Sequence, residues 1–572
     1  MSSVLPWSDL LVIAVYLIGI TWLGLRLGRK VEGQGDYFMP RTFGKGMMMM
    51  HAFGTGTASD QAVVVASGTF RQGLAGIWYQ WLWLFNTPFY WLIAPIFRRF
   101  RATTTADVYA LRFGQSVAVL FAIVGILGLA VKIGLLLKGA GALIESGTQG
   151  ALSANWAVPL VAVLFVAYGM AGGLAAAIVT DYIQGILTIL FSVMLLPWVL
   201  GVVHGWEGVR ATIDDPAMLS LVAPEGITPF FIATFSVLSL VGIVAQPFIM
   251  GVCAAGRTEM DGRFGFVVGN LIKRLCTAAW AITGLAALAW YQQRGVEFST
   301  IDPDQVYGEL AATFLPQAMP GLLGLFLASL LAGVMSSCDS MMISAAGLFT
   351  ENIYRPLAPG RSPSHYLMVG RWVSLLIVLG GVGFAFGMAS VVSGLKTWLK
   401  IAPMLGVAFW LGLFWRRYNG VGAWVSTLTG FAVWGLTLHP AWINGLNEQA
   451  WATKLGLIVE TKGKVMMYEP WQIVFYLGTA VVAGVLASLV TPRHHPEAVQ
   501  RFYDLIRTPI EPGERSTSSC VLPDGVVPSD RPCFFPGSDF EFPKPSATSV
   551  LGFMACWIAV GVMIGGLLWL LG

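Results

Sequence analysis

Oxygen-bearing side chains cluster in the segment Leu331–Tyr354, within an otherwise apolar stretch. Its central part, AGVMSSCDSMM, places Ser336, Ser337, Asp339 and Ser340 within two helical turns. Hydrocarbon does not accommodate a carboxylate and several hydroxyls that lack partners, whereas such oxygens suit a hard cation such as sodium. Serines and small residues also pack membrane helices against one another. The carboxylate favours an ion site over a plain helix contact.

Two apolar segments carry signals for a break in the helix. Segment 45–70 has the run GTGTASDQ at mid-span, and glycines and β-hydroxyl residues weaken a helix there. Segment 228–254 contains Gly242–Pro247, where the proline frees one backbone carbonyl, although an ordinary proline kink would explain that pattern too. Broken helices at the bilayer midplane bind ions and solutes in many transporters. Two breaks five helices apart suit two inverted five-helix repeats.

Three carboxylates lie within predicted spans, at Asp60, Asp181 and Asp339. Each needs water, a cation or another polar group. A cation between the broken helix and the serine-rich helix would satisfy several of them, with Ser336, Ser337 and backbone carbonyls near Ala58 and Gln61 as further oxygens. Asp181 is also suited to anchoring a helix end.

Other polar residues in the spans have simpler interpretations. Lys132, Lys138 and Glu145 lie along one span. Lys138 and Glu145 are seven residues apart and share a helix face, so an internal ion pair is favoured over solute contact. His51 is expected to pack rather than bind a ligand. An interfacial aromatic belt accounts for most of the cluster WYQWLW at 78–83, although Gln80 or a tryptophan could face a solute cavity.

The composition is that of a polytopic helical membrane protein. Of the 572 residues, 56% are hydrophobic and 11% charged, against roughly 25% charged in soluble domains. About fourteen apolar runs approach the ~20 residues of a spanning helix. They are 7–27, 45–70, 76–97, 116–147, 154–172, 176–203, 228–254, 265–291, 319–351, 367–389, 393–415, 420–438, 471–491 and 549–571, of which 45–70, 228–254 and 319–351 are expected to be irregular.

Charge asymmetry between the loops predicts the orientation. Basic residues, including Arg29 and Lys30, gather in the loops 28–45 and 98–115 and after residues 354 and 415, whereas the alternate loops are acidic and include Glu225. The positive-inside rule then makes the basic loops cytoplasmic and both termini external. The first apolar run lacks a preceding basic region, so we expect a spanning helix rather than a cleaved signal. Segment 492–548 is expected to be an irregular cytoplasmic loop, and no basic arm for nucleic acid is present.

Several motifs, in order, resemble the sodium:solute symporter family over about residues 5–490. FRRFRATTTADVYALRFG is similar to the family's arginine-rich stretch, GGLAAAIVTDYIQG to its GGxxAVxxTDxxQ motif, AGVMSSCDSMM to its AAxMSTxDS motif, and AQPFIM to the GQPH segment of proline-type members. The resemblance implies an all-α, LeuT-like fold with inverted five-helix repeats at about 45–203 and 228–415. It implies a transmembrane domain over 1–491 and an extra helix at 549–572.

The resemblance also implies site residues. The main sodium site would comprise Ala58, Gln61 and Gly333 through their carbonyls, and Ser336 and Ser337 through their hydroxyls. A second sodium site would use Asp181, Ser336, Asp339 and Ser340. Asp60, Gln80, Gln246 and Pro247 are expected to contact or gate the solute.

These expectations define a sodium-coupled symporter rather than an enzyme. It would take up a small polar solute, an amino acid, organic anion or sugar, with one or two Na⁺, across the plasma (inner) membrane. Membrane lipid would be its surroundings, and no obligate protein partner is evident. Proton coupling and a transporter-like membrane sensor are the alternatives. Val65 stands where galactose carriers have a glutamine, which disfavours a galactose-like solute.

Overall fold

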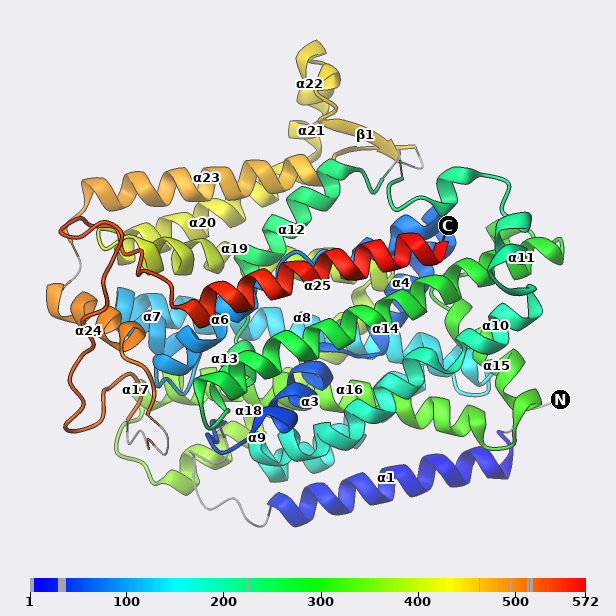
Figure 1. The fold of residues 1–572 in the computed structure, drawn as a ribbon, viewed down its shortest axis with the longest axis horizontal. Coiled ribbons are helices and arrows are strands. Elements are labelled where there is room, and N and C mark those ends of the chain that lie inside the picture. The colour runs from blue at the N-terminus through cyan, green and yellow to red at the C-terminus, as the bar shows by residue number, and fades with distance from the viewer. Residues whose placement is uncertain are drawn as a thin grey trace.

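The computed structural model is mostly helical and describes residues 5–28, 38–223, 226–461, 463–493, 495–511, 514 and 518–571. Long helices run side by side along the longest axis of the molecule (Figure 1). Arg29, Lys30 and Glu225, which contribute to the predicted charge asymmetry, lie outside the described residues.

The amino-terminal part contains the first broken helix. Its elements are α1 (Trp7–Gly28), α3 (Lys45–Gly56), α4 (Ser59–Gln72), η1 (Gly73–Ile77), α5 (Trp78–Trp81), α6 (Thr87–Arg99), α7 (Thr105–Phe113), α8 (Gln115–Gly147), α9 (Ala154–Met194) and α10 (Leu196–Val202). The predicted break in 45–70 is confirmed, because α3 ends and α4 begins on either side of Thr57 and Ala58.

The middle part contains the second broken helix. It comprises α11 (Gly205–Thr212), η2 (Pro216–Leu219), α12 (Pro229–Ile243), α13 (Ile249–Ala254), α14 (Glu259–Gln293), η3 (Phe298–Thr300), α15 (Val306–Ala318), α16 (Leu322–Gly347), η4 (Leu348–Tyr354), α17 (Arg355–Leu357), α18 (Pro363–Gly387) and α19 (Val391–Phe414). Helices α12 and α13 are separated at 244–248, which confirms the break predicted near Pro247. The irregularity expected in 319–351 is a π-helical turn, η4, that continues α16.

The carboxy-terminal part adds peripheral elements. These are α20 (Gly420–Thr437), α21 (Pro440–Asn447), α22 (Ala450–Lys454), β1 (Ile458–Thr461), β2 (Lys464–Met467), α23 (Glu469–Val490), α24 (Pro496–Arg507) and α25 (Ala547–Leu571). Strands β1 and β2 pair antiparallel, with Ile458 opposite Met467, and project from the helices together with α21 and α22 (Figure 1).

Segment 492–548 is not irregular throughout, because it contains α24. The interpretation from its Pro and Ser content missed the amphipathic spacing of Val499, Phe502 and Ile506, which are buried on one helix face.

The predicted count of about fourteen spans is not confirmed. Among the described residues, nine helices are long and apolar enough to cross a membrane, or ten if the bent pair α20–α21 is one span. The numbers differ because the predicted spans 45–70, 76–97 and 228–254 are divided into shorter helices, while 154–172 and 176–203 share α9.

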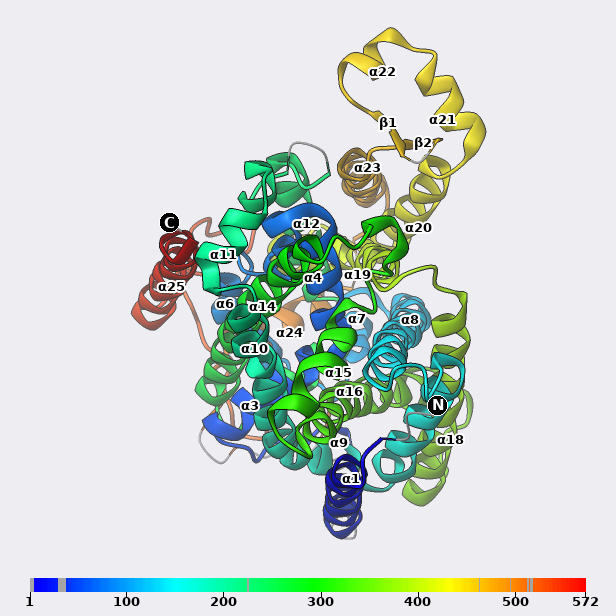
Figure 2. The same ribbon diagram turned by 90° about the vertical axis from the view of Figure 1, so that its right-hand side faces the viewer.

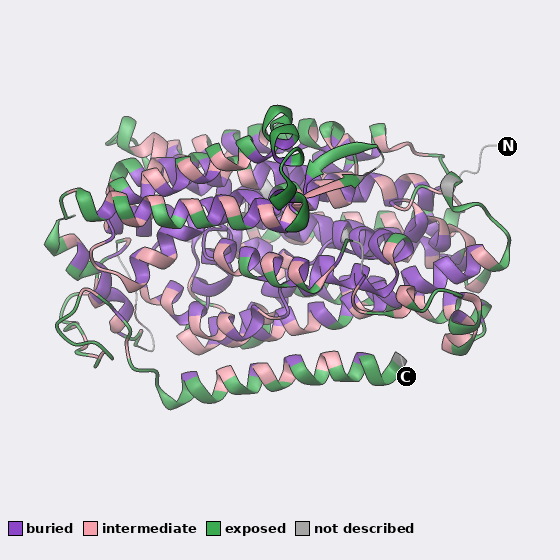
Figure 3. Cartoon of the chain, turned by 90° about the horizontal axis from the view of Figure 1, so that it is seen from above, coloured by how far each residue is buried: buried purple, intermediate pink, exposed green. Residues whose placement is uncertain are grey.

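The elements that position the site lie in the centre of the molecule. Helix α14 packs along α3, α4 and α6, and α16 packs against α9, α8 and α1. A view along the bundle places α1 and α25 at its periphery (Figure 2). Burial follows this arrangement, since the central helices are mostly buried whereas α25 is largely exposed (Figure 3).

Candidate sodium and solute site

The break between α3 and α4 faces other helices rather than lipid. Thr57 and Ala58 are both extended and buried. Gly333 of α16 approaches them closely, since a Cβ on Gly333 would lie 3.5 Å from both the Thr57 carbonyl oxygen and the Ala58 Cα. Gly54 is required as well, because a Cβ there would lie 2.6 Å from Ser336 Oγ. The glycines therefore allow the broken backbone to contact α16.

A buried polar network joins α3, α9 and α16. Ser336 Oγ donates a hydrogen bond of 2.5 Å to Asp181 Oδ1, and His51 Nδ1 lies 2.6 Å from Asp181 Oδ2. Thr55 Oγ1 lies 3.2 Å from His51 Nδ1 and 3.0 Å from Ser340 Oγ. All five side chains are buried. The predicted intramembrane carboxylate Asp181 is thus hydrogen-bonded on both of its oxygens, and Asp60 of α4 pairs with Lys132 of α8, as described below.

The residues expected to form the main sodium site converge on the same break. The Ser337 hydroxyl donates to the Gly54 carbonyl at 3.0 Å. The Gln61 amide donates to the Ala58 carbonyl at 3.1 Å, and the Gln61 side-chain amide donates to the Gly56 carbonyl. The break thus gathers Ala58, Gln61, Gly333, Ser336 and Ser337.

The oxygens at the break fit a hard cation. Thr57 Oγ1 and Gln61 Oε1 are buried and have no hydrogen-bond partner in the described part of the chain. Ser336 donates its proton to Asp181, so its oxygen keeps lone pairs for a cation. Buried polar oxygens usually have a partner, and a cation would supply one.

The second predicted set is also buried, in adjoining positions. Asp181 contacts Ser336 directly, and Ser340 joins the network through Thr55. Asp339 is 1% exposed and interacts electrostatically with Tyr16 of α1.

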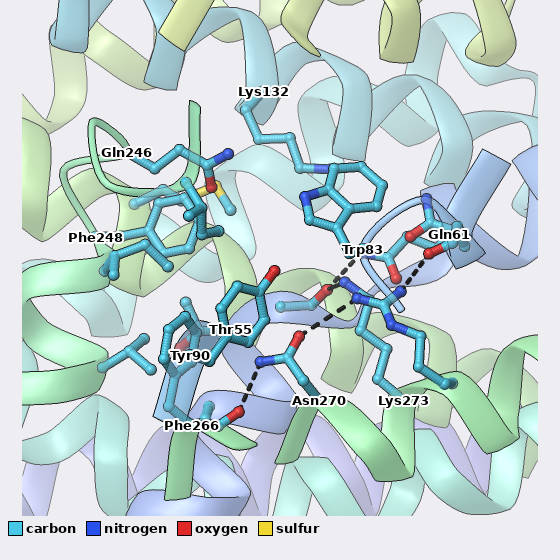
Figure 4. A pocket seen from close by; sticks show the side chains of 18 of the residues that line it. Thr55, Gln61, Trp83, Tyr90, Lys132, Gln246, Phe248, Phe266, Asn270 and Lys273 are labelled. Atoms are coloured by element: carbon cyan, nitrogen blue, oxygen red, sulfur yellow. Dashed lines mark hydrogen bonds between the residues drawn. The ribbon is translucent and has the colours of Figure 1, made fainter. Parts of the chain in front are cut away.

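A cavity of about 50 Å³ adjoins the break. Two of its walls come from the two broken helices, and α14 supplies a third (Figure 4). Gln80 and Gln246, which are expected to contact the solute, both line this cavity. The other lining residues are Ala52, Thr55, Gly56, Gln61, Trp83, Tyr90, Lys132, Ile243, Phe248, Ile249, Val252, Phe266, Asn270, Lys273, Arg274, Met341, Leu395 and Trp398. Pro247 lines a smaller cavity of about 20 Å³ instead, which shares Gln246, Phe248 and Trp398 with the first.

Three cationic side chains line this cavity. Lys132 Nζ of α8 pairs with Asp60 Oδ2 at 2.7 Å, and both side chains are buried. Asp60 therefore acts behind the cavity wall rather than in it. Lys273 of α14 donates to the Gly56 carbonyl at the end of α3. Arg274 donates to the Gln80 carbonyl at 2.5 Å.

Three interpretations from the sequence need correction. His51 is a partner of Asp181 rather than a packing residue, a contact between helices 130 residues apart that spacing does not reveal. The internal ion pair expected from the spacing of Lys138 and Glu145 is not found among the described residues, and Lys132 of the same helix pairs with Asp60 of α4. The aromatic cluster at 78–83 does not form an exposed belt, because Trp78, Tyr79, Trp81 and Trp83 are at most 5% exposed.

Lys273 and Arg274 were missed by sequence reasoning. They stand side by side in the apolar stretch GFVVGNLIKRLCTAAW. A charged side chain within a spanning helix needs a partner, whether it is an aspartate or a cation. The two adjacent cations could therefore have been recognised from the sequence as candidate site residues.

Residues of the carboxy-terminal segment contact the chain at the end of α6 and the start of α14. Arg101 Nε donates to Glu514 Oε1 at 2.6 Å, and the Ile510 amide donates at 2.9 Å to Glu259, which also pairs with Arg99 at 2.7 Å. Burial alone would raise the pKa of Glu514, but hydrogen bonding and the charge of Arg101 outweigh it, so this pKa is lowered. These contacts connect Ile510 and Glu514 to α6 and α14, two helices that line the cavity.

Broken helices, a buried oxygen-rich break and an adjoining polar cavity are the features of a secondary transporter. The profile of the sodium:solute symporter family matches residues 37–430, more than half of the chain. The chain belongs to this family, and the family and its relatives are transporters rather than enzymes.

Individual relatives agree with this assignment. The osmoregulated proline transporter of Bacillus subtilis (strain 168) is 23% identical over 500 residues, 84% of this chain and 94% of that protein. The sodium/glucose cotransporter of Vibrio parahaemolyticus is 26% identical over 476 residues, 74% of this chain and 84% of that protein.

A solved structure shows the same fold. It is a substrate-bound, outward-open Na⁺-coupled sialic acid symporter, with a TM-score of 0.68 and 16% identity, covering 85% of this chain and 99% of that one. The multi-pass helical fold expected from the sequence is thereby confirmed.

Proposed function

We propose that this protein is a sodium-coupled symporter that takes up a small polar solute by alternating access. The observation that carries the proposal is the shared break between α3 and α4. Its residues contact Ser337 of α16 on one side, whereas Thr55, Gly56 and Gln61 line the solute cavity on the other. One irregular segment of backbone thus serves both ligands, so binding of one changes the surroundings of the other.

In this proposal the main sodium ion is held by Ala58, Gln61, Gly333, Ser336 and Ser337. A second ion would be held by Asp181, Ser336, Asp339 and Ser340, next to His51. Moving one charge through 100 mV releases about 2.3 kcal/mol, so two ions would support steeper accumulation than one.

The proposed location is the plasma (inner) membrane, surrounded by lipid, with both termini external and segment 492–548 cytoplasmic. The apolar side chains of Leu376 on α18 and Ile558 on α25 are 64% and 65% exposed, which suits hydrocarbon contact. The proposed membrane domain is 1–491, with α25 as an additional span.

The decisive experiment compares uptake in sodium and in choline media at fixed pH, using purified protein in liposomes. We expect sodium-dependent uptake, weakened by Ser337→Ala and by Asp181→Asn through a raised half-saturation concentration for sodium. Ser329→Ala is the matched control, since this hydroxyl lies on the same helix but bonds to the Leu325 carbonyl of its own helix at 2.7 Å.

Three outcomes would contradict the proposal. Unchanged sodium affinity in both variants would exclude the assigned ligands. Equal uptake in sodium and choline, with a dependence on the pH gradient, would instead favour proton coupling through Asp181 and His51. Solute binding without transport would favour a membrane sensor.

A further inference from the structure

The cavity carries an excess of positive charge. Its lining residues include Lys132, Lys273 and Arg274, and none of them is Asp or Glu. Asp60, directly behind the wall, compensates Lys132 at 2.7 Å. Two cations are therefore left without a carboxylate among the residues that surround the cavity.

Lys273 has donors to spare. Its side chain is buried, and an ammonium group has three N–H donors. One donates to the Gly56 carbonyl, and the described residues provide no further acceptor and no carboxylate within ion-pair distance. Trp83 lies under the ammonium, with the ring centroid 5.8 Å from Nζ. Buried cations are normally paired, so the remaining donors favour an anionic ligand in the cavity.

Arg274 adds a second positive charge at the same wall. It is 1% exposed, and its terminal nitrogens donate to the Gln80 carbonyl at 2.5 Å and to Asn270 Oδ1 at 3.4 Å. Within the described chain, Arg274 Nε has no acceptor and Gln80 Oε1 has no donor. Unsatisfied polar atoms in the lining of a cavity indicate groups that await a ligand.

Away from the two cations, aromatic side chains form part of the lining. Tyr90 and Phe248 lie across the cavity from Lys273 and Gln61 in Figure 4, and Phe266 of α14 stacks on Tyr90 with ring centroids 4.3 Å apart; these three rings form the aromatic wall. The volume of about 50 Å³ corresponds to roughly three to five water-sized groups at about 10–15 Å³ each. The cavity thus suits a small solute with one charged end and one apolar end.

We propose, building on the function proposed above, that the solute is a small monocarboxylate without an amino group. Its carboxylate accepts hydrogen bonds from Lys273, in the field of Arg274, and its short carbon chain packs against the aromatic wall. An amino acid would add an ammonium group to a cavity that already has excess positive charge and no acidic lining residue. A sugar would leave both cations uncompensated.

The test uses the full-length protein in detergent and in liposomes. Thermal unfolding in sodium and in choline is measured with acetate, propionate and pyruvate as monocarboxylates, with proline and alanine as zwitterions, and with glucose and inositol as neutral solutes. Solutes that stabilise the protein are then tested for uptake. We expect sodium-dependent stabilisation and uptake for the monocarboxylates alone.

The variant Lys273→Gln is the specific test. We expect it to raise the half-saturation concentration for the monocarboxylate by about ten- to a hundredfold, the range for losing a hydrogen bond to a charged group, while sodium still stabilises the protein. Lys273→Arg should retain part of the affinity. Lys138→Gln, on α8 and outside the cavity lining, is the matched control and should resemble wild type.

The outcomes separate this inference from the symporter assignment. Sodium-dependent uptake of proline or glucose but of no monocarboxylate would overturn the inference and leave the symporter assignment intact. Unchanged monocarboxylate affinity in Lys273→Gln would overturn the role of this residue. Absence of any sodium effect would overturn both proposals.

Discussion

The buried pair between Asp60 and Lys132 gives the most demanding prediction. The two groups lie 2.7 Å apart, and their residues are 0% and 4% exposed. Lys132 is also stacked over Trp398, with Nζ 4.7 Å from the ring centroid. In Asp60→Asn the Lys132 ammonium stays buried without its carboxylate, in a cavity lining that also contains Lys273 and Arg274. Removing one partner of a buried pair costs about 3–5 kcal/mol, so we expect Asp60→Asn to reduce the free energy of unfolding by an amount in this range.

A double variant tests whether the loss of stability comes from the unpaired Lys132 charge. Asp60→Asn combined with Lys132→Met removes both charges, and replacing a buried pair by uncharged groups is often neutral. We therefore expect the double variant to be more stable than Asp60→Asn alone. The coupling energy from the double-mutant cycle should reach about 0.5–3 kcal/mol, as for other residues in contact.

The assay is reversible unfolding in detergent at fixed sodium, followed by tryptophan fluorescence, with uptake measured in parallel. Asp214→Asn, at an exposed position, is the control and should lie close to wild type. The explanation fails if Asp60→Asn is as stable as wild type. It also fails if the double variant loses the sum of the two single losses.

Three shorter predictions concern the break, the cavity and the carboxy-terminal segment. Gly54→Ala places a Cβ 2.6 Å from Ser336 Oγ. A sodium titration of uptake should therefore show a raised half-saturation concentration, and the free energy of unfolding should fall by about 1–3 kcal/mol. The control Gly46→Ala, whose Cβ meets no atom within 4 Å, should show neither effect. Gln246→Ala should weaken solute binding, measured by isotope competition, without changing sodium affinity, and an equal loss of both would contradict its placement. The pKa of Glu514 is lowered in the folded protein, so its contribution to stability is complete above the pKa of an unpaired glutamate and disappears as the pH falls through the lowered value. Unfolding of wild type and Glu514→Gln should therefore differ at neutral pH and converge in acid, and a constant difference would contradict the ion pair.

The sequence allowed the prediction of elements that depend on local chemistry. Both helix breaks followed from glycine, β-hydroxyl residues and proline, whose effects on a helix do not depend on distant contacts. The serine-rich segment of α16 and Asp181 were recognised because polar groups in hydrocarbon need partners. Gln80 and Gln246, two of the residues expected to contact the solute, both line the cavity.

What the sequence did not provide was the pairing of residues far apart in the chain. His51 and Asp181 meet across 130 residues, and Lys132 meets Asp60 across 72 residues. The aromatic cluster at 78–83 was assigned to the membrane interface because aromatic residues suit both environments. Only contacts between α5 and α14, such as the hydrogen bond of 3.1 Å from Trp81 Nε1 to the Arg274 carbonyl, distinguish the two environments.

The two ends of the α3–α4 break are held by different helices. The carbonyl end of α3 carries the negative end of a helix dipole and meets Lys273 of α14. The amide end of α4 carries the positive end, with Asp60 in its first turn bound to Lys132 of α8. A break in a buried helix exposes one negative and one positive helix end, and here a side chain of opposite charge lies at each of them. These two side chains offset part of the cost of interrupting the helix at Thr57 and Ala58.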